Sequence, residues 1–244
     1  MLKKTEQPPI PAYYRLQKNI LSDIEKGRWK PGDSLPPERA LAALHNMSIG
    51  TVKKALLNLT HAGYIHRIQG KGTFVAGTPI SKESLRYYRL YEKFGDEVAV
   101  LKLRLKQLSR IASFDPVSSY LGIQSNEKIY EMRRLFITGN QPVVYSVSYL
   151  PVNLFQDLDR RPLTHLETIP LYQLLEETYG LPTLYNKELF DAVKANSDTA
   201  FNLKIAKGSP VLQIEMLSFT YRDKAYEYRR SYCQTSRKKV FREI

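Results

Sequence analysis

The stretch from residue 34 to residue 75 constrains the fold of this chain more than any other. A helix is expected to begin after Pro37, because a proline's missing N–H costs nothing in the first turn. His45-Asn46-Met47 then forms a turn, and the Ser48 hydroxyl can cap a second helix by accepting an otherwise unpaired backbone N–H. Four apolar residues of that second helix recur at the spacing of one buried face: Val52, Ala55, Leu56 and Leu59. The pattern predicts two short helices joined by a tight turn.

A small basic hairpin is expected after the second helix. Gly63 can end that helix, since glycine adopts the left-handed conformation without a steric penalty. Two short apolar runs, Tyr64 to Ile68 and Thr73 to Val75, are joined by Gln69-Gly70-Lys71-Gly72, which is typical of a β-hairpin. Helix, turn, helix and hairpin in this order predict a winged helix-turn-helix. In that motif the second helix enters a DNA major groove and the wing reaches the backbone or the minor groove.

The side chains expected to contact DNA lie on the outward face of the second helix, on the first helix and at the hairpin tip. They are Arg39, Ser48, Ile49, Gly50, Thr51, Lys53, Gly70, Lys71 and Gly72, with Lys54 beside them. The alternative interpretation is a small helical subdomain with a solvated basic face. The Gly-Lys-Gly tip of the wing favours DNA binding.

The distribution of charge supports a polyanionic partner. The 244-residue chain has a net charge of +13, and its first 77 residues hold twelve Lys and Arg against five Asp and Glu. The remaining residues hold twenty-five against nineteen, so the charge per residue is more than twice as high in the first part. Phosphate contacts release counterions, so binding should weaken with salt. A membrane surface is disfavoured, because no amphipathic Lys/Arg helix with an aromatic apolar face accompanies the charge.

The sequence predicts two domains. Gly77-Thr78-Pro79-Ile80-Ser81 combines turn formers with low hydrophobicity. We therefore expect a DNA-binding domain over residues 1–77, a linker over 78–84 and a second domain over 85–244, with a flexible proline-rich arm before residue 12.

Beyond the boundary, the periodicity changes to that of strands. Alternation over 101–106 and apolar runs over 129–137, 142–150, 183–193, 211–221 and 225–233 predict strands, several joined by tight turns. Short helices are expected near 116–121, 171–178 and 198–203. The mixture predicts an α+β domain with a largely antiparallel sheet.

Several classes of protein are disfavoured by what the sequence lacks. Cys233 is the only cysteine, so no intrachain disulfide can form, and no Cys or His at zinc spacing lies near it. The four histidines are scattered, and no Ser/His/Asp set or glycine-rich phosphate loop is present. We therefore expect no enzyme, no catalytic residues, no metal and no cofactor. No apolar run approaches the ~18 residues that span a bilayer, and the N-terminus lacks the apolar core of a signal peptide, so a cytoplasmic location is expected.

The first third of the chain resembles GntR-family transcription regulators. The resemblance rests on Tyr14, Ile24, Gly27, Pro31-Gly32-Asp33, Leu35-Pro36, Glu38-Arg39, Leu41-Ala42, Ser48, Thr51-Val52, Ala55-Leu56, Leu59, Gly63 and Gln69-Gly70-Lys71-Gly72-Thr73-Phe74-Val75. The wing sequence from Gly70 to Val75 is its most specific part. The resemblance implies a bacterial DNA-binding regulator.

Residues 85–241 resemble the UTRA effector-binding domain of the HutC-type GntR regulators, which has the chorismate-lyase fold. The resemblance rests on the order and spacing of Ile129-Tyr130, Arg134-Leu135, Gly139, Pro142-Val143, Tyr149-Leu150-Pro151, Leu171-Tyr172, Leu174-Leu175-Glu176, Tyr179-Gly180, Gly208, Pro210-Val211-Leu212, Glu227-Tyr228 and Tyr232. It implies that a small molecule binds inside this domain and changes how two DNA-binding heads are held.

The resemblance also implies an effector site, from which this chain departs. Well-understood members resemble phosphosugar sensors with an Arg-x-Arg pair, a Ser two residues before a helical Tyr, and a Glu on the last strand. Arg134, Tyr172 and Glu227 match, whereas the second arginine falls on Phe136 and the serine on Pro170. A Glu often found on the second hairpin strand falls on Ser146. The expected effector residues are therefore Arg134, Phe136, Ser146, Tyr172, Glu227 and Tyr232.

These departures change the expected ligand. A phosphate carries nearly two charges and favours several charge-assisted donors, ideally bidentate arginine. We expect a ligand that is not a phosphosugar, with at most one anionic group and an apolar or aromatic part. Arg134 would bind the anion, Phe136 and Tyr172 would line an apolar wall, and Glu227 would bind a hydroxyl or amine. The alternative is that Arg134 and Glu227 pair with each other and no ligand binds.

The DNA-reading helix departs from the family as well. The family usually has arginine directly after the capping serine, and here that position is Ile49. Arginine commonly reads guanine, whereas an aliphatic side chain contacts the thymine methyl, so we expect A·T pairs opposite Ile49. Gly50 can allow the DNA backbone to approach closely. The alternative for Ile49 is packing against the wing or the first helix.

Three functions remain to be compared. The leading one is a homodimeric, ligand-responsive repressor, because two-fold operators require two heads. The second is a ligand-independent DNA-binding protein whose second domain only dimerises. The third is a lyase-type enzyme on the same fold, for which the residues offer no support.

Overall fold

The computed structural model describes residues 11–77, 90–91, 93, 101–236 and 239–240. The expected N-terminal arm, up to residue 10, and the expected linker lie outside the described residues. The chain folds as two compact units, one of residues 1–77 with 221–223 and the other of residues 78–220 with 224–244.

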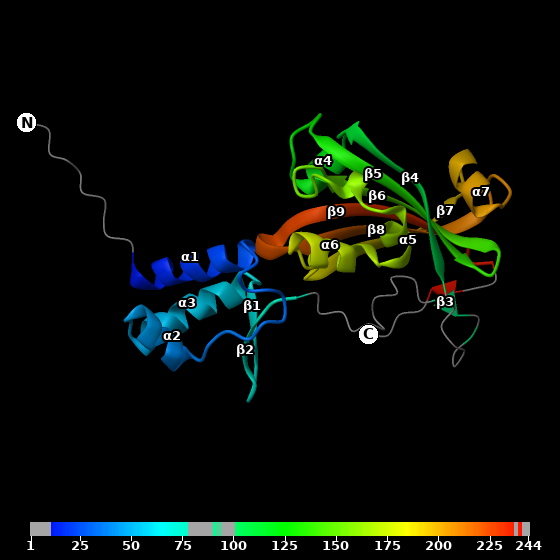
Figure 1. The fold of residues 1–244 in the computed structure, drawn as a ribbon. Helices are drawn as coiled ribbons and strands as arrows, with labels where there is room; N and C mark the ends of the chain where they lie inside the picture. The colour runs from blue at the N-terminus through cyan, green and yellow to red at the C-terminus, as the bar shows by residue number, and fades with distance from the viewer. Residues whose placement is uncertain (1–10, 78–89, 92, 94–100, 237–238, 241–244) are drawn as a thin grey trace, which may run out of the picture. The chain divides into compact units, whose positions relative to one another are not determined.

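The first unit is a three-helix bundle with a two-stranded wing (Figure 1). Its elements are α1 (Ala12–Glu25), α2 (Glu38–His45), α3 (Ile49–His61), β1 (Ile65–Ile68) and β2 (Gly72–Val75). Its core is formed by the apolar stripes of the helices, and it includes Leu16, Ile20, Ile24, Leu41, Val52, Ala55, Leu56 and Leu59. The spacing that predicted the buried face of the second helix is confirmed.

Local backbone geometry shapes this bundle. Asn46 ends α2 in the left-handed conformation with a φ of 49°, which asparagine tolerates better than most residues. Gly63, just after α3, has a φ of 73°. The Leu35 N–H donates to the Thr73 carbonyl at 2.8 Å, and Ser34 forms a β-bridge with Phe74. These contacts attach the wing to the segment that precedes α2.

The second unit is built on a six-stranded sheet in the order β4-β5-β6-β9-β8-β7, with all neighbours antiparallel. The strands are β4 (Lys102–Ala112), β5 (Lys128–Thr138), β6 (Gln141–Pro151), β7 (Tyr185–Lys194), β8 (Pro210–Thr220) and β9 (Lys224–Cys233). A separate short pair joins β3 (Leu90–Tyr91) to β10 (Lys239–Val240). The predicted α+β architecture with an antiparallel sheet is confirmed.

Helices and irregular segments cover both faces of this sheet. The helical elements of this unit are α4 (Val117–Leu121), η1 (Leu158–Arg160), α5 (Leu163–Thr168), α6 (Leu171–Tyr179) and α7 (Ser197–Leu203). The turn η2 (Tyr221–Asp223), between β8 and β9, belongs to the first unit. One face packs against α5 and α6 through a cluster that includes Tyr130, Met132, Leu150, Leu166, Leu171, Leu174 and Leu175. The other packs against α4 and α7 through a cluster that includes Val117, Leu121, Tyr145, Val147, Ala200 and Leu203. We call these the α6 face and the α7 face.

Some elements were absent from the sequence expectations. The first strand of the sheet continues to Ala112 rather than ending near residue 106, and η1, α5, β3 and β10 had no counterpart. These additional elements are only two to six residues long. Segments this short carry too little periodicity to be recognised without their tertiary neighbours.

Candidate functional site

The exposed end of α3 forms the first candidate site. Ser48 caps the helix, with its Oγ accepting the Thr51 N–H at 3.1 Å and lying 2.9 Å from Thr51 Oγ1. Ile49, Gly50 and Lys53 are exposed in the first turns of the helix. Helix N-termini attract anions, because their unpaired N–H groups and the helix dipole both favour negative charge.

The two unusual residues of this surface are not explained by packing. Ile49 has 42% of its surface exposed, so the structure does not bury it against the wing or the first helix. A Cβ added to Gly50 would meet only Ser48 Oγ, at 3.9 Å, and the Gly50 backbone has no positive φ. Nothing within this unit therefore requires glycine there, and its missing side chain leaves room for a partner.

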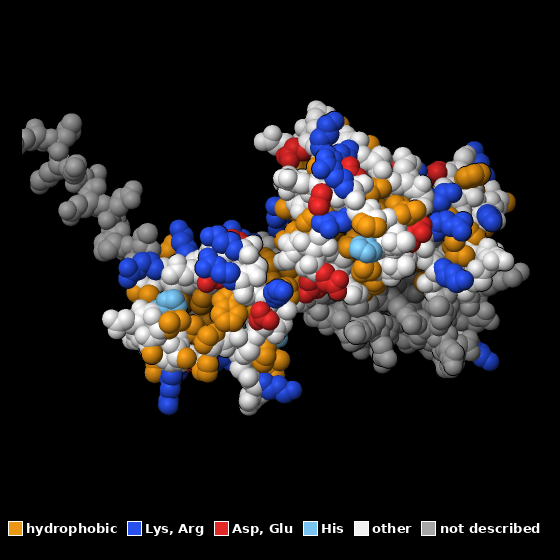
Figure 2. Space-filling model, viewed as in Figure 1, with side chains coloured by type: hydrophobic (Ala, Val, Ile, Leu, Met, Phe, Trp, Pro, Cys, Tyr) orange, Lys and Arg blue, Asp and Glu red, His pale blue; other side chains and the backbone are white. Residues whose placement is uncertain are grey.

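The wing and α2 complete this surface. Arg39 on α2 and Lys71 at the wing tip are exposed, and the Lys71 N–H closes the tip by donating to the Ile68 carbonyl at 3.0 Å. Arg67, which the sequence reasoning did not single out, forms an ion pair with Glu38 that joins the wing to α2. Lys54 lies with its Nζ 4.2 Å from the centroid of the Tyr13 ring, so it also contacts α1. Figure 2 shows basic side chains projecting from the face of this unit.

The second candidate site is a group of polar side chains buried in the α6 face of the sheet. Its centre is an ion pair within β9. Arg229 donates from Nε to Glu227 Oε1 at 2.8 Å and from Nη2 to Oε2 at 2.9 Å. Arg229 Nε also lies 3.1 Å from Ser148 Oγ on β6. Both charged residues are only 1% exposed, so the pair is desolvated and needs its bidentate geometry to offset that penalty.

Strand register brings further polar residues beside this pair. Arg134 on β5 lies opposite Ser146 on β6, which lies opposite Ser231 on β9. Ser218 on β8 lies opposite Glu227. Directly opposed residues of antiparallel strands share a face, with Cβ atoms about 4.5–5.5 Å apart. We call this set the buried polar cluster: Arg134, Ser146, Ser148, Ser218, Glu227, Arg229 and Ser231, each at most 2% exposed.

Two hydroxyls of the buried polar cluster are not satisfied by the described part of the chain. Ser146 Oγ and Ser218 Oγ are buried and have no hydrogen-bond partner among the described residues. Buried polar atoms in proteins are nearly always paired, so such hydroxyls call for an explanation. A bound molecule with donors or acceptors of its own would provide one.

Four of the other expected effector residues lie at or near this cluster. The Arg134 guanidinium carbon lies 5.8 Å from the centroid of the Phe136 ring, and Phe136 packs with a small apolar cluster. Tyr172 is buried on α6, whose leucines pack on the same face. Glu227 bonds to Arg229, a residue that the sequence reasoning did not single out.

The structure does not bring Tyr232 to this group, and its contact with the effector stays a prediction. Tyr232 lies opposite Tyr145 and stacks on it, with ring centroids 6.3 Å apart, on the α7 face. The reason is parity, because successive residues of a strand point to opposite faces and Ser231 takes the α6 face.

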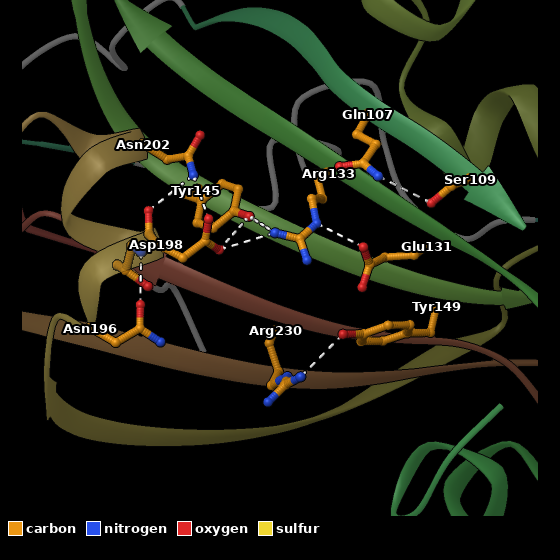
Figure 3. A network of polar contacts seen from close by, with 11 residues as sticks. Gln107, Ser109, Glu131, Arg133, Tyr145, Tyr149, Asn196, Asp198, Asn202 and Arg230 are labelled. Carbon is orange, nitrogen blue, oxygen red and sulfur yellow. Dashed lines mark hydrogen bonds and ion pairs between the residues drawn. The ribbon is translucent and has the colours of Figure 1, made fainter. Parts of the chain in front are cut away.

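The α7 face carries a different polar network, which Figure 3 shows. Arg133 donates to Glu131 at 2.7 Å, to the Tyr145 hydroxyl at 2.9 Å and to Asp198 at 3.1 Å. The Tyr145 hydroxyl donates to Asp198 at 2.8 Å, and burial together with this bond raises the Tyr145 pKa. The network fixes the start of α7 on the sheet, and its polar groups are bonded to one another.

The residues that the sequence reasoning missed carry a recognisable signal. Arg229 and Ser231 follow the predicted Glu227 at alternate positions along β9, and Ser148 follows the predicted Ser146 along β6. Both strands are otherwise buried on both faces, so polar residues at every second position mark one polar strip. The signal becomes visible only once both faces are known to be covered.

Other kinds of site lack support in the described residues. No group of three or more His, Cys, Asp and Glu side chains among them is arranged to hold a metal ion. No helix within the described ranges is long and apolar enough to cross a membrane.

Comparison with protein families gives two matches along the chain. Residues 12–75 match the model for bacterial regulatory proteins of the gntR family. Residues 99–239 match the model for the UTRA domain, which covers more than half of the chain.

Curated relatives align over nearly their whole length. The HTH-type transcriptional regulator YurK of Bacillus subtilis is 29% identical over 217 residues, 87% of each chain. The HTH-type transcriptional repressor NagR of Bacillus subtilis is 26% identical over 93% of this chain and 91% of its own. A repressor named for the fructoselysine utilization operon of Escherichia coli is 25% identical over 92% of this chain and 91% of its own.

Solved structures share the fold. The ligand-binding domain of a GntR-family transcriptional regulator from Bordetella bronchiseptica superimposes with a TM-score of 0.60 and 26% identity, over 65% of this chain and 98% of its own. The regulator YydK of Bacillus subtilis superimposes with a TM-score of 0.55 and 21% identity, over 96% of this chain and all of its own.

Proposed function

Because this chain belongs to the GntR family of bacterial regulatory proteins and carries a UTRA domain, we propose that it is a dimeric cytoplasmic repressor controlled by a monoanionic ligand. Its family is one of DNA-binding transcriptional regulators, not of enzymes. The ligand binds in the buried polar cluster and shifts the protein between arrangements that differ in operator affinity. A ligand can shift such an equilibrium only by binding one arrangement better than the other.

The observation that supports a monoanion is the small number of charge-assisted donors in the buried polar cluster. Arg229 is already bonded to Glu227 by a bidentate ion pair. Arg134 lies on the same face at 2% exposure, beside the apolar ring of Phe136. A phosphate of nearly two charges favours several charge-assisted donors, whereas a single carboxylate needs fewer.

The other side chains around Arg134 suggest the uncharged part of the ligand. Phe136 provides an apolar wall beside Arg134, and the unpaired hydroxyls of Ser146 and Ser218 can bond to hydroxyl or amine groups. Two curated relatives carry names that refer to fructoselysine utilization and to mannosyl-D-glycerate transport and metabolism. Both compounds carry a carboxylate group together with sugar hydroxyls.

The binding experiment is calorimetry on the full chain with a panel of carboxylates, both aromatic acids and sugar acids. We expect at least one monocarboxylate to bind and to raise the melting temperature. Arg134→Met should abolish that response, whereas Arg133→Met, on the other face of the same strand, should retain it. Glucosamine-6-phosphate is the dianionic comparison, and clear micromolar binding of this phosphosugar would contradict the monoanion proposal.

The DNA-binding half of the proposal concerns the first turn of α3. Arg39, Ser48, Ile49, Gly50, Thr51, Lys53 and the wing residues Gly70, Lys71 and Gly72 form the proposed contact surface. Ile49 is exposed and aliphatic, so it contacts a thymine methyl, and Gly50 allows close approach of the DNA.

Selection of bound sites from random DNA tests this surface. We expect a two-fold site with A·T pairs opposite Ile49, and Ile49→Arg should change the preference at those positions toward G·C. Leu57→Arg is the matched control, because Leu57 is exposed later in α3, and it should leave base preference unchanged. Recovery of a G·C core by the unmodified protein would show the Ile49 assignment to be wrong.

One observation favours a second function, a dimeric DNA-binding protein without a ligand. The Glu227–Arg229 pair is already satisfied internally, as in a purely structural ion pair. Operator affinity unchanged across the carboxylate panel, together with no thermal stabilisation, would favour this architecture.

A further inference from the structure

A groove in the second unit lies on the α7 face of the sheet, away from the buried polar cluster. It has a volume of about 1020 Å³ and runs between the first half of β4, the turn after β5 and the end of α7. Two of its lining residues, Leu135 and Ile137 on β5, pack with the core cluster of the α7 face. The groove therefore differs from the proposed ligand site in both position and surroundings.

Four exposed cations line this groove: Lys102, Arg104 and Lys106 from β4 and Lys204 from the end of α7. None of the four forms an ion pair with any residue in the part of the chain that the structure describes. Among the described lining residues the single carboxylate is Glu167, whose Oε1 accepts the Leu105 N–H at 2.8 Å. Figure 2 shows Lys and Arg side chains gathered over this end of the sheet. The groove therefore attracts anions.

Protection of the sheet edge accounts for only some of these cations. Lysine and arginine on an edge strand discourage pairing with another chain, and β4 is an edge strand. Lys204 lies outside that strand and ends α7 in the left-handed conformation, with a φ of 55°. Glycine would avoid the backbone strain at such a position. A lysine at this position, in the lining of the groove, points to a use for its charge.

A bulge adds another cation to the groove. The register of β4 against β5 shifts between Leu105 and Gln107, so Lys106 is an extra residue between two paired ones. Bulges are common beside functional sites, where they redirect a side chain. The extra residue lines the groove together with Lys102 and Arg104.

The α7 side of the groove provides an aromatic ring and an amide. Phe201 has 77% of its surface exposed, so its ring is accessible to a planar partner. Asn202 Nδ2 donates to the Asp198 carbonyl oxygen at 3.0 Å and to Asp198 Oδ1 at 3.1 Å. The Asn202 Oδ1 points away from Asp198 (Figure 3) and accepts no hydrogen bond within the described ranges. This oxygen can therefore accept a hydrogen bond from a bound molecule.

We propose that this groove binds a nucleoside polyphosphate, with its phosphates on the four cations and its base against Phe201. Several phosphates together carry the negative charge that a group of unpaired cations favours. An aromatic ring stacks on any base, because every base has a π face. The proposal goes beyond the proposed function and does not depend on it, because the buried polar cluster lies on the opposite face of the sheet.

Calorimetry on the full chain tests the proposal, with ATP, AMP and inorganic tripolyphosphate as probes. We expect ATP to bind more tightly than AMP, and its affinity to fall as salt rises, because the cations are exposed. Arg104→Glu and Lys204→Glu should each weaken ATP and tripolyphosphate by about tenfold, since each replaces a charge-assisted contact by repulsion. Phe201→Ala should weaken ATP by at least about fivefold and leave tripolyphosphate unchanged, because only ATP has a base to stack.

Two matched charge reversals serve as controls. Lys207→Glu changes an exposed residue outside the groove and Lys71→Glu one at the wing tip, so both should bind ATP like the unmodified chain. All of the changed side chains are exposed, so melting temperatures should stay close to that of the unmodified chain. Absence of ATP and tripolyphosphate binding, or a loss of binding confined to Lys71→Glu, would overturn the proposal. Normal ATP binding by Phe201→Ala would overturn the assignment of a base.

A DNA strand is the other source of phosphates, and a duplex without operator sequence distinguishes it from a nucleotide. We expect Arg104→Glu and Lys204→Glu to bind this duplex like the unmodified chain while losing ATP. Variants that bind the duplex more weakly and ATP normally would identify DNA as the occupant and overturn the nucleotide proposal. These results do not depend on the carboxylate panel, so failure of the proposed ligand site is scored separately.

Discussion

Arg133 and Arg134 are consecutive residues of β5 that face opposite sides of the same sheet. Arg133, on the α7 face, donates to Glu131, Tyr145 and Asp198, and 30% of its side chain remains in contact with solvent. The residues of this network are partly exposed to solvent and hydrogen-bond to one another, as expected of a group that fixes α7 on the sheet.

Arg134, on the α6 face, lies in a different environment. It is 2% exposed, contacts the Phe136 ring and lies opposite Ser146, whose hydroxyl has no partner among the described residues. Burying charges and hydroxyls costs free energy unless each is paired. The comparison supports a structural role for the α7 network, and we propose a ligand for the buried polar cluster, where the Ser146 hydroxyl has no partner among the described residues.

Removing one arginine from each face should give the largest difference in the free energy of unfolding. Arg229→Met leaves the Glu227 carboxylate buried without its partner, which should lower the free energy of unfolding by about 3–5 kcal/mol. Arg133→Met removes a partly exposed partner and should cost about 1 kcal/mol. Urea denaturation measures both, and the double variant Glu227→Met/Arg229→Met should lose less than Arg229→Met alone. A larger loss for Arg133→Met would reverse the proposed roles of the two faces.

The Tyr145 hydroxyl tests the structural role of the α7 face. Tyr145→Phe removes a group that bonds Arg133 at 2.9 Å and Asp198 at 2.8 Å, and it should cost about 1–2 kcal/mol in stability. Its ligand response should match that of the unmodified chain, because the hydroxyl faces away from the buried polar cluster. Thermal melts with and without ligand measure both quantities, and a lost ligand response would place the site on the wrong face.

Cys233 gives a pH test of burial on the α6 face. It lies opposite Val144 in the sheet, and burial raises the pKa of its thiol from 9.0 to about 12. The folded state therefore holds this proton more tightly than the unfolded state. The stability from this difference is present below pH 9 and is lost as pH rises from 9 toward 12.

The unfolding free energies of the unmodified chain and Cys233→Ala should be compared at pH 8 and pH 10. Relative to the variant, the unmodified chain should lose about 1 kcal/mol between these values, since one pKa unit corresponds to about 1.4 kcal/mol. Tyrosines titrate in both proteins and cancel in the comparison. A pH-independent difference would show that the thiol is not desolvated.

The smallest stability effect is expected for the two unpaired hydroxyls. Ser146→Ala and Ser218→Ala remove atoms that bond to nothing among the described residues, so stability should change by less than about 0.5 kcal/mol. Ligand affinity should nevertheless fall, because a hydrogen bond to the ligand is lost. Calorimetry with a carboxylate that binds in the proposed panel measures this affinity. Unchanged affinity for both variants would show that the two hydroxyls do not contact the ligand.

The fold and the exposed site residues of the first unit were easier to predict from sequence than the buried site of the second unit. In the first unit, periodicity, the Ser48 cap and the Gly-Lys-Gly tip lie within one short stretch, and each is read from neighbouring residues. Helix periodicity and capping are local properties, so the motif and its exposed residues followed without knowledge of any distant contact.

In the second unit, the sequence predicted the strands but not which side chains share a face. Glu227 and Tyr232 were both expected to contact the effector, and parity places them on opposite faces of the sheet. The pairing considered for Glu227 was with Arg134, whereas its bidentate partner is Arg229, two residues along the same strand and on the same face. Which face is buried, and beneath which helix, depends on strands far apart in the chain.

The sequence by itself determined the winged helix-turn-helix and the antiparallel α+β domain, because these depend on local periodicity and turn chemistry. Its motifs also carried the resemblance to the family. Only the tertiary structure decided that Arg134, Ser146, Ser218 and Glu227 share one buried face while Arg133 belongs to another network. Register and burial are set by packing between distant segments, which no stretch of sequence contains.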